Sequence, residues 1–337
     1  MANEVVLTNK IFLNAVLPLL KVIAADVPNL SKKFEGMNAV FQVSALDPNA
    51  EGGKVGTYFE VVDGEWTVKN DQVAENPDVD LEFKTLEAMN GYFKGKIGPA
   101  TLPKMKGAIK KTKVFMALLM TLLKMSSLLT AKAAPEKEED KVLMVKCFFY
   151  LLSAGISQLN KQGHESVHEW TSKSPDRVYA WAVDGYPELS AYIRIKAGKS
   201  KAGRGVYKRA LRFFTMRFDC LDSALGILMS TDDMLESTRT GKLIMDGAPE
   251  FGAQIGGFMA QGLGQGFERE MQKVDRQINA AVPHELESPG LTRYGSRGGV
   301  TVVQYNTYQS PKALSPAESA RQTRLATQRA ALALQGG

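Results

Sequence analysis

Two distant segments of the chain repeat one another, and this repeat limits the folds that the sequence can adopt. FKTLEAMNGYF at 83–93 aligns without a gap with FDCLDSALGIL at 218–228, and the segments that follow end in KMKG (104–107) and IMDG (244–247). An Asp-Gly pair precedes each of these two aligned segments. We therefore expect an α+β protein with two copies of one unit, each a mostly antiparallel sheet with helices on one face.

Both copies contain a hairpin signal. Residues 54–69 read KVGTYFEVVDGEWTVK and residues 177–196 read RVYAWAVDGYPELSAYIRIK, with β-branched and aromatic residues on both sides of an Asp-Gly pair. Such a pair suits a type I′ turn, which needs positive φ at both central positions. Further strands are expected at 79–83 and 209–219. GKSKAGRG at 198–205 is rich in glycine and lysine, lacks a phosphate-binding pattern, and is expected to be an exposed loop.

Apolar residues at helical spacing predict four helices, at 4–24, 86–93, 114–129 and 141–162. Pro18 should kink the first of them. The helix at 141–162 is apolar almost all round, so we expect it to be buried on several sides.

These elements suggest three parts, namely a first domain at 1–134, a second and divergent domain at 141–267, and a linker with a C-terminal segment at 268–337. The stretch AKAAPEKEED at 131–140 reads as a linker between the copies. The sequence leaves open whether the copies pack together or swing on that linker. In the C-terminal segment, an alternating strand and a capped, Ala- and Arg-rich helix are expected.

Composition places the chain among ordinary globular proteins. Of 337 residues, 44% are apolar and 23% are charged, which excludes a disordered chain or a collagen-like fibre. Lys124 and Lys146 interrupt the two most apolar segments, so neither is expected to span a bilayer, and a membrane-surface helix is the alternative. The N-terminus makes a poor secretory signal, and a cytoplasmic protein is expected.

The first copy resembles the sterol carrier protein family of the type-two, lipid-transfer kind. The resemblance covers about residues 30–125 and rests on GTYFEVVDGEWTVKN…NPDVDLEFKTLEAMNGYFKGKIGPATLPKMKGAIK. The residues that match the family pattern are Asp63, Gly64, Pro77, Asp78, Val79, Gly95, Lys96 and Gly107. The second copy, at about 165–262, is similar more loosely and lacks the Pro-Asp-Val triplet.

This resemblance implies a five-stranded sheet with helices over an apolar tunnel that takes a fatty acyl chain or a sterol-like lipid, usually without enzyme activity. Methionine adapts to irregular apolar shapes, so a tunnel lined with methionine would accept chains of differing length, although the same residues also suit a plain core. The candidate tunnel residues are Phe83, Met89, Phe93, Met105, Phe115, Met116, Leu119, Met120, Phe218, Leu225, Leu228, Met234, Met245, Phe258 and Met259.

The C-terminal segment VTVVQYNTYQSPKALSPAESARQTRLATQRAAL resembles the extreme C-terminus of phage tail tape-measure and minor tail proteins. That resemblance implies docking to a tail-tip or baseplate protein and gives an alternative function, a structural component of a phage or phage-like tail associated with virion particles. The candidate docking residues are Val302, Tyr305, Leu314, Arg321, Arg324 and Leu325.

No catalytic constellation is evident, so we expect a non-enzymatic protein without a cofactor or metal; a lipid-thioester hydrolase is a remote alternative. His164 and His168 are spaced to share a helix face but lack a third ligand, and surface histidines are expected. Cys147 and Cys220 lie in apolar contexts and are expected to be buried thiols.

The basic residues are clustered. Nine lysines and no acid occur between residues 88 and 134, and nine lysines or arginines and no acid between 190 and 217. These runs suit either solvated loops and strand faces, or attraction to an anionic membrane surface or to a lipid carboxylate at a tunnel mouth. Nucleic acid is a poorer partner, because base-stacking aromatics are not interleaved with the charges.

Overall fold

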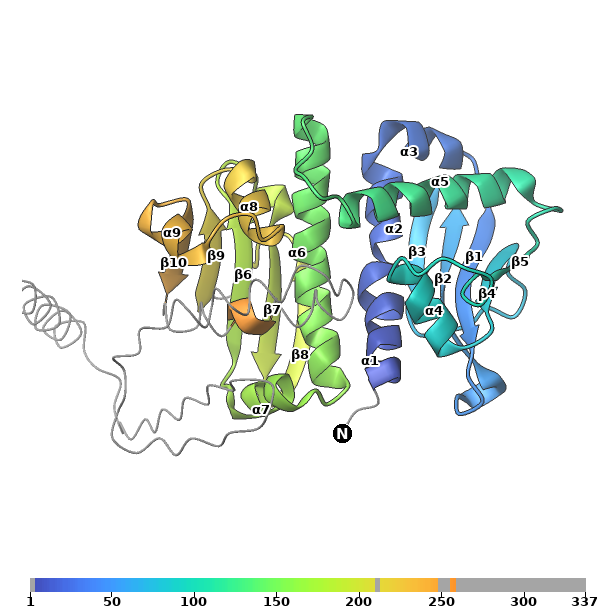
Figure 1. The fold of residues 1–337 in the computed structure, drawn as a ribbon, viewed down its shortest axis with the longest axis horizontal. Coiled ribbons are helices and arrows are strands. Elements are labelled where there is room, and N and C mark those ends of the chain that lie inside the picture. The colour runs from blue at the N-terminus through green and yellow to red at the C-terminus, as the bar shows by residue number, and fades with distance from the viewer. Residues whose placement is uncertain (1–3, 210–212, 248–254, 259–337) are drawn as a thin grey trace, which may run out of the picture. The chain divides into compact units, whose positions relative to one another are not determined.

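The structure is a computed structural model that describes residues 4–209, 213–247 and 255–258. The first copy holds a five-stranded sheet with the order β3-β2-β1-β4-β5 (Figure 1). Neighbouring strands run antiparallel except for the central β1–β4 pair, which is parallel. The strands are β1 (Ala39–Leu46), β2 (Lys54–Val62), β3 (Glu65–Lys69), β4 (Val79–Phe83) and β5 (Lys104–Lys106).

The second copy repeats this sheet strand for strand, with the order β10-β9-β6-β7-β8 and a parallel β6–β9 pair at its centre. Its strands are β6 (Arg177–Val183), β7 (Ala191–Lys196), β8 (Lys199–Arg204), β9 (Phe214–Phe218) and β10 (Leu243–Gly247). Leu81 pairs with Met105 across β4–β5, and the aligned residues Met216 and Met245 pair across β9–β10. The connectivity and register therefore repeat as the sequence predicts, although both sheets are mixed.

Corresponding helices flank the two sheets. In each copy a long helical segment precedes the first strand, which is β1 or β6. A short helix follows the strand that pairs in parallel with it, which is β4 or β9, and one further helix lies between the two copies. The helices are α1 (Glu4–Ile11), α2 (Leu19–Asp26), α3 (Pro28–Phe34), α4 (Leu86–Phe93), α5 (Thr112–Leu129), α6 (Glu138–Lys161), α7 (Glu165–Lys173), α8 (Leu221–Leu228) and α9 (Met234–Arg239), with short 3-10 turns at Glu51–Gly53 and Pro187–Leu189.

Pro18 disturbs the N-terminal helical segment, as expected. Between α1 and α2 lies a π-helical turn, Phe12–Val16, in which the Leu17 amide donates to the Phe12 carbonyl at 2.9 Å. Proline has no amide hydrogen and its ring crowds the preceding turn, so the hydrogen-bond register changes there. The apolar side chains on both sides of the change stay buried.

Helix α6 packs against both copies. Phe149 stacks with Phe218 of β9 at 6.0 Å between ring centroids, and α6 also contacts β7 and β8. It also packs on α1, the π-helical turn and α2, and the Lys146 ammonium lies 2.5 Å from an Asp26 carboxylate oxygen. Burial on several sides explains why this helix is apolar almost all round, as predicted.

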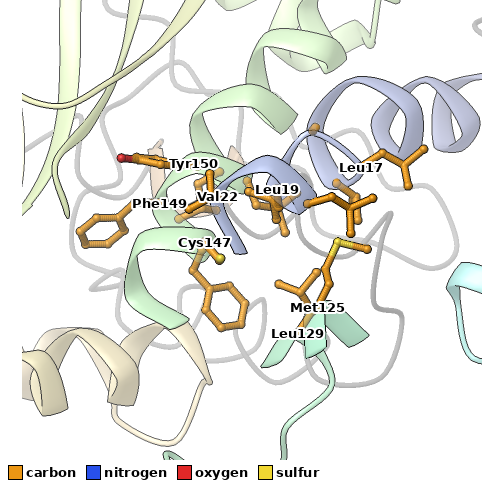
Figure 2. Packing of buried hydrophobic residues seen from close by; sticks show 14 of the residues in the cluster. Leu17, Leu19, Val22, Met125, Leu129, Cys147, Phe149 and Tyr150 are labelled. Carbon is orange, nitrogen blue, oxygen red and sulfur yellow. The ribbon is translucent and has the colours of Figure 1, made fainter. Parts of the chain in front are cut away.

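The apolar contact between the copies is shown in Figure 2. Leu17, Leu19 and Val22 from the first long helical segment lie near α5 and α6. Met125 and Leu129 from α5 and Cys147 from α6 belong to the same buried cluster. The described parts of both copies accordingly belong to one compact unit.

The two Asp-Gly pairs make different connections. Asp63 and Gly64 have φ of 50° and 83°, the positive values that a type I′ hairpin turn requires. In the second copy Gly185 alone of the pair has positive φ, and a longer connection with a 3-10 turn joins β6 to β7. The second pair therefore marks a hairpin, but the two-residue turn expected there was wrong.

Two further expectations need correction. Residues 199–204 form the edge strand β8 rather than a loop, and Gly203 leaves room for the Tyr192 ring, because a Cβ there would lie 2.4 Å from the Tyr192 hydroxyl. Linker 131–140 is also shorter than expected, because α6 already begins at Glu138. Hydrogen bonds from Asn160 of α6 to the Gly198 carbonyl and the Ser200 hydroxyl stabilise the β8 edge.

Gly107 closes the first sheet. Its φ is 77°, and a Cβ there would lie 2.0 Å from the Asp78 carbonyl oxygen, so the backbones meet where any side chain would collide. The Pro-Asp-Val and Lys-Gly motifs of the sterol-carrier resemblance are thus in direct contact.

We expect Gly107→Ala to lower the free energy of unfolding by about 2–4 kcal/mol, because it adds a backbone collision to left-handed strain. Gly95→Ala is the matched control, since Gly95 has φ of 78° with no atom within 4 Å of its Cβ position. That control should lose about 1–2 kcal/mol. Urea unfolding of the full chain measures both, and equal losses would contradict the close approach.

Candidate lipid-binding site

The candidate tunnel residues divide into three groups by burial. Fully or almost fully buried are Phe83, Met89, Phe218, Leu225, Leu228 and Phe258. Partly buried are Phe93, Phe115, Leu119, Met234 and Met245. Exposed are Met105, Met116 and Met120, while Met259 lies outside the described residues.

Aromatic side chains fill much of the space between helices and sheet in the first copy. Trp66 of β3 lies 4.9 Å from Phe34 and 5.3 Å from Phe41 between ring centroids. Phe93 of α4 lies 5.2 Å from Phe12 and 6.0 Å from Phe83. An acyl chain would therefore enter only if one of the covering helices moved.

The second copy contains a cavity of about 420 Å³ beside α8, which is in the range of small-molecule sites. Of the candidate tunnel residues that the structure describes, Leu225 alone lines it, together with acidic residues and Lys242. The Ser223 hydroxyl donates to Asp219, another lining residue, and lowers the pKa of that carboxyl group. This polar lining does not suit an acyl chain.

A buried charged cluster lies on the face of the first sheet that carries Asp80 and Glu82, which are 2% and 8% exposed. The Lys54 ammonium lies 2.7 Å from an oxygen of each carboxylate, and Lys106 lies 2.6 Å from Glu82. Ser44 also donates to Asp80 at 2.7 Å. Sequence reasoning missed this cluster, although the alternation Val-Asp-Leu-Glu-Phe along β4 carries the signal for it.

Burial acts to raise the pKa of Glu82, but hydrogen bonds from Lys106 and Lys54 outweigh it, and the pKa lies below the usual glutamate value. Both carboxylates in this cluster are bound by ammonium groups. Glu82 is therefore not poised to take or give a proton near neutral pH.

The second copy keeps one of these ion pairs with its charges reversed. Arg217 aligns with Glu82 and Asp246 with Lys106, and the Arg217 Nε lies 2.9 Å from an Asp246 carboxylate oxygen. Each pair joins the crossover strand to the edge strand beside it. With either polarity, the pair links the edge strand to the strand beside it.

The cysteines differ, which corrects one expectation. Cys147 is buried as predicted, and burial raises the pKa of its thiol to about 12. Cys220 is exposed, because it precedes α8 at the helix N-terminus, where its sulfur lies 3.3 Å from the Ser223 hydroxyl. The expectation of a second buried thiol was wrong.

His164 and His168 lie at the start of α7. His164 precedes the helix and is half-buried, and burial lowers its pKa. His168 is exposed, and its Nδ1 lies 3.2 Å from the Asn160 side-chain oxygen. Within the described ranges, no group of three or more His, Cys, Asp or Glu side chains could hold a metal ion.

In the part of the chain that the structure describes, three helical segments are long and apolar enough to cross a membrane by length and composition. Two of them, Glu4–Asp26 and Glu138–Lys161, have 78% and 83% of their most apolar window buried within the protein. The third, α5, has only 39% of that window buried. Among the three, α5 is therefore the helix with apolar surface left for another partner.

The docking residues expected between 302 and 325 lie outside the described residues, so their role stays a prediction. No protein-family model matches the chain, and no curated protein matches it.

Thiol labelling tests the cysteine assignment. In the native full chain we expect one fast equivalent of reaction with a disulfide reagent, abolished by Cys220→Ser, because the thiolate is the reacting form and Cys147 is buried with a raised pKa. The second equivalent should appear only in denaturant. Rapid native labelling of the Cys220→Ser variant would contradict the buried position of Cys147.

The charged cluster predicts a pH-dependent stability. Because the folded-state pKa of Glu82 is lowered, its stabilisation is fully present above the unfolded value of about 4.3 and is lost as pH falls through the folded value. We expect Glu82→Gln to cost about 1–3 kcal/mol at pH 7, and the difference from the native chain to shrink in acid.

Glu60→Gln is the matched control, because the Glu60 carboxylate lies 3.8 Å from Lys69 in an exposed pair. It should change the free energy of unfolding by less than about 1 kcal/mol at either pH. Urea unfolding at pH 7 and at about pH 2.5, below the window in which the stabilisation is lost, measures both variants. If Glu82→Gln lowers the free energy of unfolding by the same amount at both pH values, the ion-paired state of Glu82 is contradicted.

Proposed function

We propose that the protein binds a fatty acyl or sterol-like lipid without enzymatic activity, with helix α5 covering the site in the first copy. The observation that carries this proposal is the apolar character of α5 on both of its faces. Ala117, Leu118 and Met125 are buried against the body of the protein, while Met116 and Met120 are 46% and 41% exposed.

A helix with apolar residues on both faces can move without exposing a strongly polar surface to an apolar guest. Helix α5 packs on α2 and α3, and Phe115 and Leu119 lie at its boundary, partly buried. If α5 moved outward, space for an acyl chain would open among these side chains. The flexible methionines can then pack around guests of differing length.

The resemblance to the sterol carrier family supports the proposal by analogy of fold. The expected five-stranded sheet with helices occurs in each copy. The residues that carry the resemblance, such as Asp63, Gly64 and Gly107, specify turns and a close approach and do not line a site. For this reason the proposal depends on a direct binding measurement.

Burial of an acyl chain stabilises the complex by about 0.8 kcal/mol for each methylene group removed from water, and no catalytic residue is needed. We expect saturated fatty acids from eight to sixteen carbons to bind the full chain below their micelle concentrations, with affinity rising about ten-fold for every two carbons. Titration calorimetry measures this series, and native mass spectrometry gives the number of chains bound.

Dicarboxylic acids of the same lengths are the matched control, because their second carboxylate would have to be buried or folded back. They should bind at least about ten-fold more weakly. An affinity independent of chain length, or the absence of bound fatty acid at every length, would overturn the proposal.

A further inference from the structure

We propose that the outer face of α5, with the turn before it, docks on the surface of an anionic lipid bilayer. This inference concerns the exterior of the first copy and does not require that an acyl chain enter its interior. It therefore goes beyond the proposed function and can succeed or fail independently of it.

Exposed apolar side chains are concentrated on this part of the chain. Of the twelve large apolar side chains exposed among the described residues, seven lie between residues 97 and 123. They are Ile97, Leu102, Met105, Ile109, Met116, Met120 and Leu123. A concentration of this kind marks an interaction surface, whereas single exposed apolar residues are ordinary.

The α5 residues of this group form one stripe along the helix. Met116, Met120 and Leu123 follow one another at four- and three-residue spacing, so they share a face, and Leu123 is 61% exposed. The opposite face, which includes Leu118 and Met125, anchors the helix to the protein body. Ile109, in the turn before α5, is 94% exposed. The stripe and this turn can enter the interfacial layer of a bilayer while the helix stays attached.

The segment of the chain that carries the stripe is rich in lysine. The segment from 88 to 134 contains nine lysines and no acid. Lys106, Lys111 and Lys124 form ion pairs with carboxylates of neighbouring segments. Five others form no ion pair within the described part of the chain, namely Lys96, Lys104, Lys110, Lys113 and Lys132. Lysine stems can lie along apolar surface while their ammonium groups reach phosphate headgroups.

Charge also distinguishes a bilayer from two other occupants. A second copy of the chain would bring two lysine-rich segments together, which like-charge repulsion opposes. Residues 300–337 contain one lysine and three arginines against a single glutamate, so this segment of the chain is also a poor electrostatic match. An anionic bilayer offers both negative headgroups and an apolar layer beneath them.

Where the structure describes it, the second lysine- and arginine-rich run of the chain lacks the stripe of exposed apolar side chains that accompanies the first. Residues 190–217 also contain nine basic residues and no acid, but Val206 is the one large apolar side chain exposed in the part of that run that the structure describes. The second run thus has the charge without the apolar stripe and supplies a matched control.

The test is co-sedimentation of the full chain with vesicles of phosphatidylcholine alone or with 30% phosphatidylglycerol, at low and high salt. We expect binding to the anionic vesicles, weakened by salt. The triple variant Met116→Gln, Met120→Gln, Leu123→Gln should lower the partition coefficient by about ten-fold or more. The variant Lys110→Glu, Lys113→Glu should also lower it by about ten-fold or more.

The control variants are Val73→Gln, Val206→Gln, Leu235→Gln for the apolar stripe and Lys199→Glu, Lys201→Glu for the charge. Circular dichroism and thermal unfolding verify that each variant folds. The controls should bind as the native chain does. Absence of binding to anionic vesicles, or equal losses in the test and control variants, would overturn the proposal.

Sedimentation velocity tests the remaining alternative, in which a second copy of the chain covers the stripe. If the native chain dimerises, and the triple glutamine variant becomes monomeric without any change in vesicle binding, a second copy covers the stripe and the proposal fails. If fatty acid titrations fail while the vesicle result holds, the proposed acyl site is wrong and the membrane-docking surface stands.

Discussion

The structure depends on the burial of α6 from both sides. A 24-residue helix with apolar side chains around most of its circumference is stable in water only when several partners cover it. Sheet β6–β10 covers one side, while α1, the π-helical turn and α2 cover another. The two copies are therefore mutually dependent parts of one hydrophobic core, and the short stretch between α5 and α6 is no swinging linker.

The two copies share their geometry but differ in the charges that they carry. The strand order, the central parallel pair and the β4–β5 register recur in the second copy. The ion pair between the crossover strand and the edge strand recurs with opposite polarity, as Glu82–Lys106 and Arg217–Asp246. Each pair holds its two strands together equally well, because Coulombic attraction does not depend on which strand carries which sign.

The lipid-related proposals converge on α5 for a physical reason. Its inner face completes the core between the copies, where Met125 and Leu129 lie near Leu17 (Figure 2). Its outer face leaves methionines and a leucine in water, which a purely structural helix would avoid. The charged cluster around Asp80 and the polar cavity beside α8 lack the apolar lining of a lipid site.

Local pattern by itself determined much of this fold. The α4 and β4 boundaries, the hairpin at Asp63-Gly64, the break at Pro18 and the existence of a repeat all follow from period, turn chemistry and alignment. These signals are local, because they depend on backbone preferences and on side chains a few residues apart.

Tertiary structure decided the features that depend on contacts between distant segments of the chain. Residues 199–204 became a strand because β7 supplies hydrogen-bond partners and Gly203 admits the Tyr192 ring. Cys220 is exposed and Cys147 buried although an apolar residue follows each of them, because only packing distinguishes a residue before a helix from one inside it. Likewise the methionines at 89, 116 and 120 carry the same side chain, and the position of each relative to the other elements decides whether it fills the core or faces solvent.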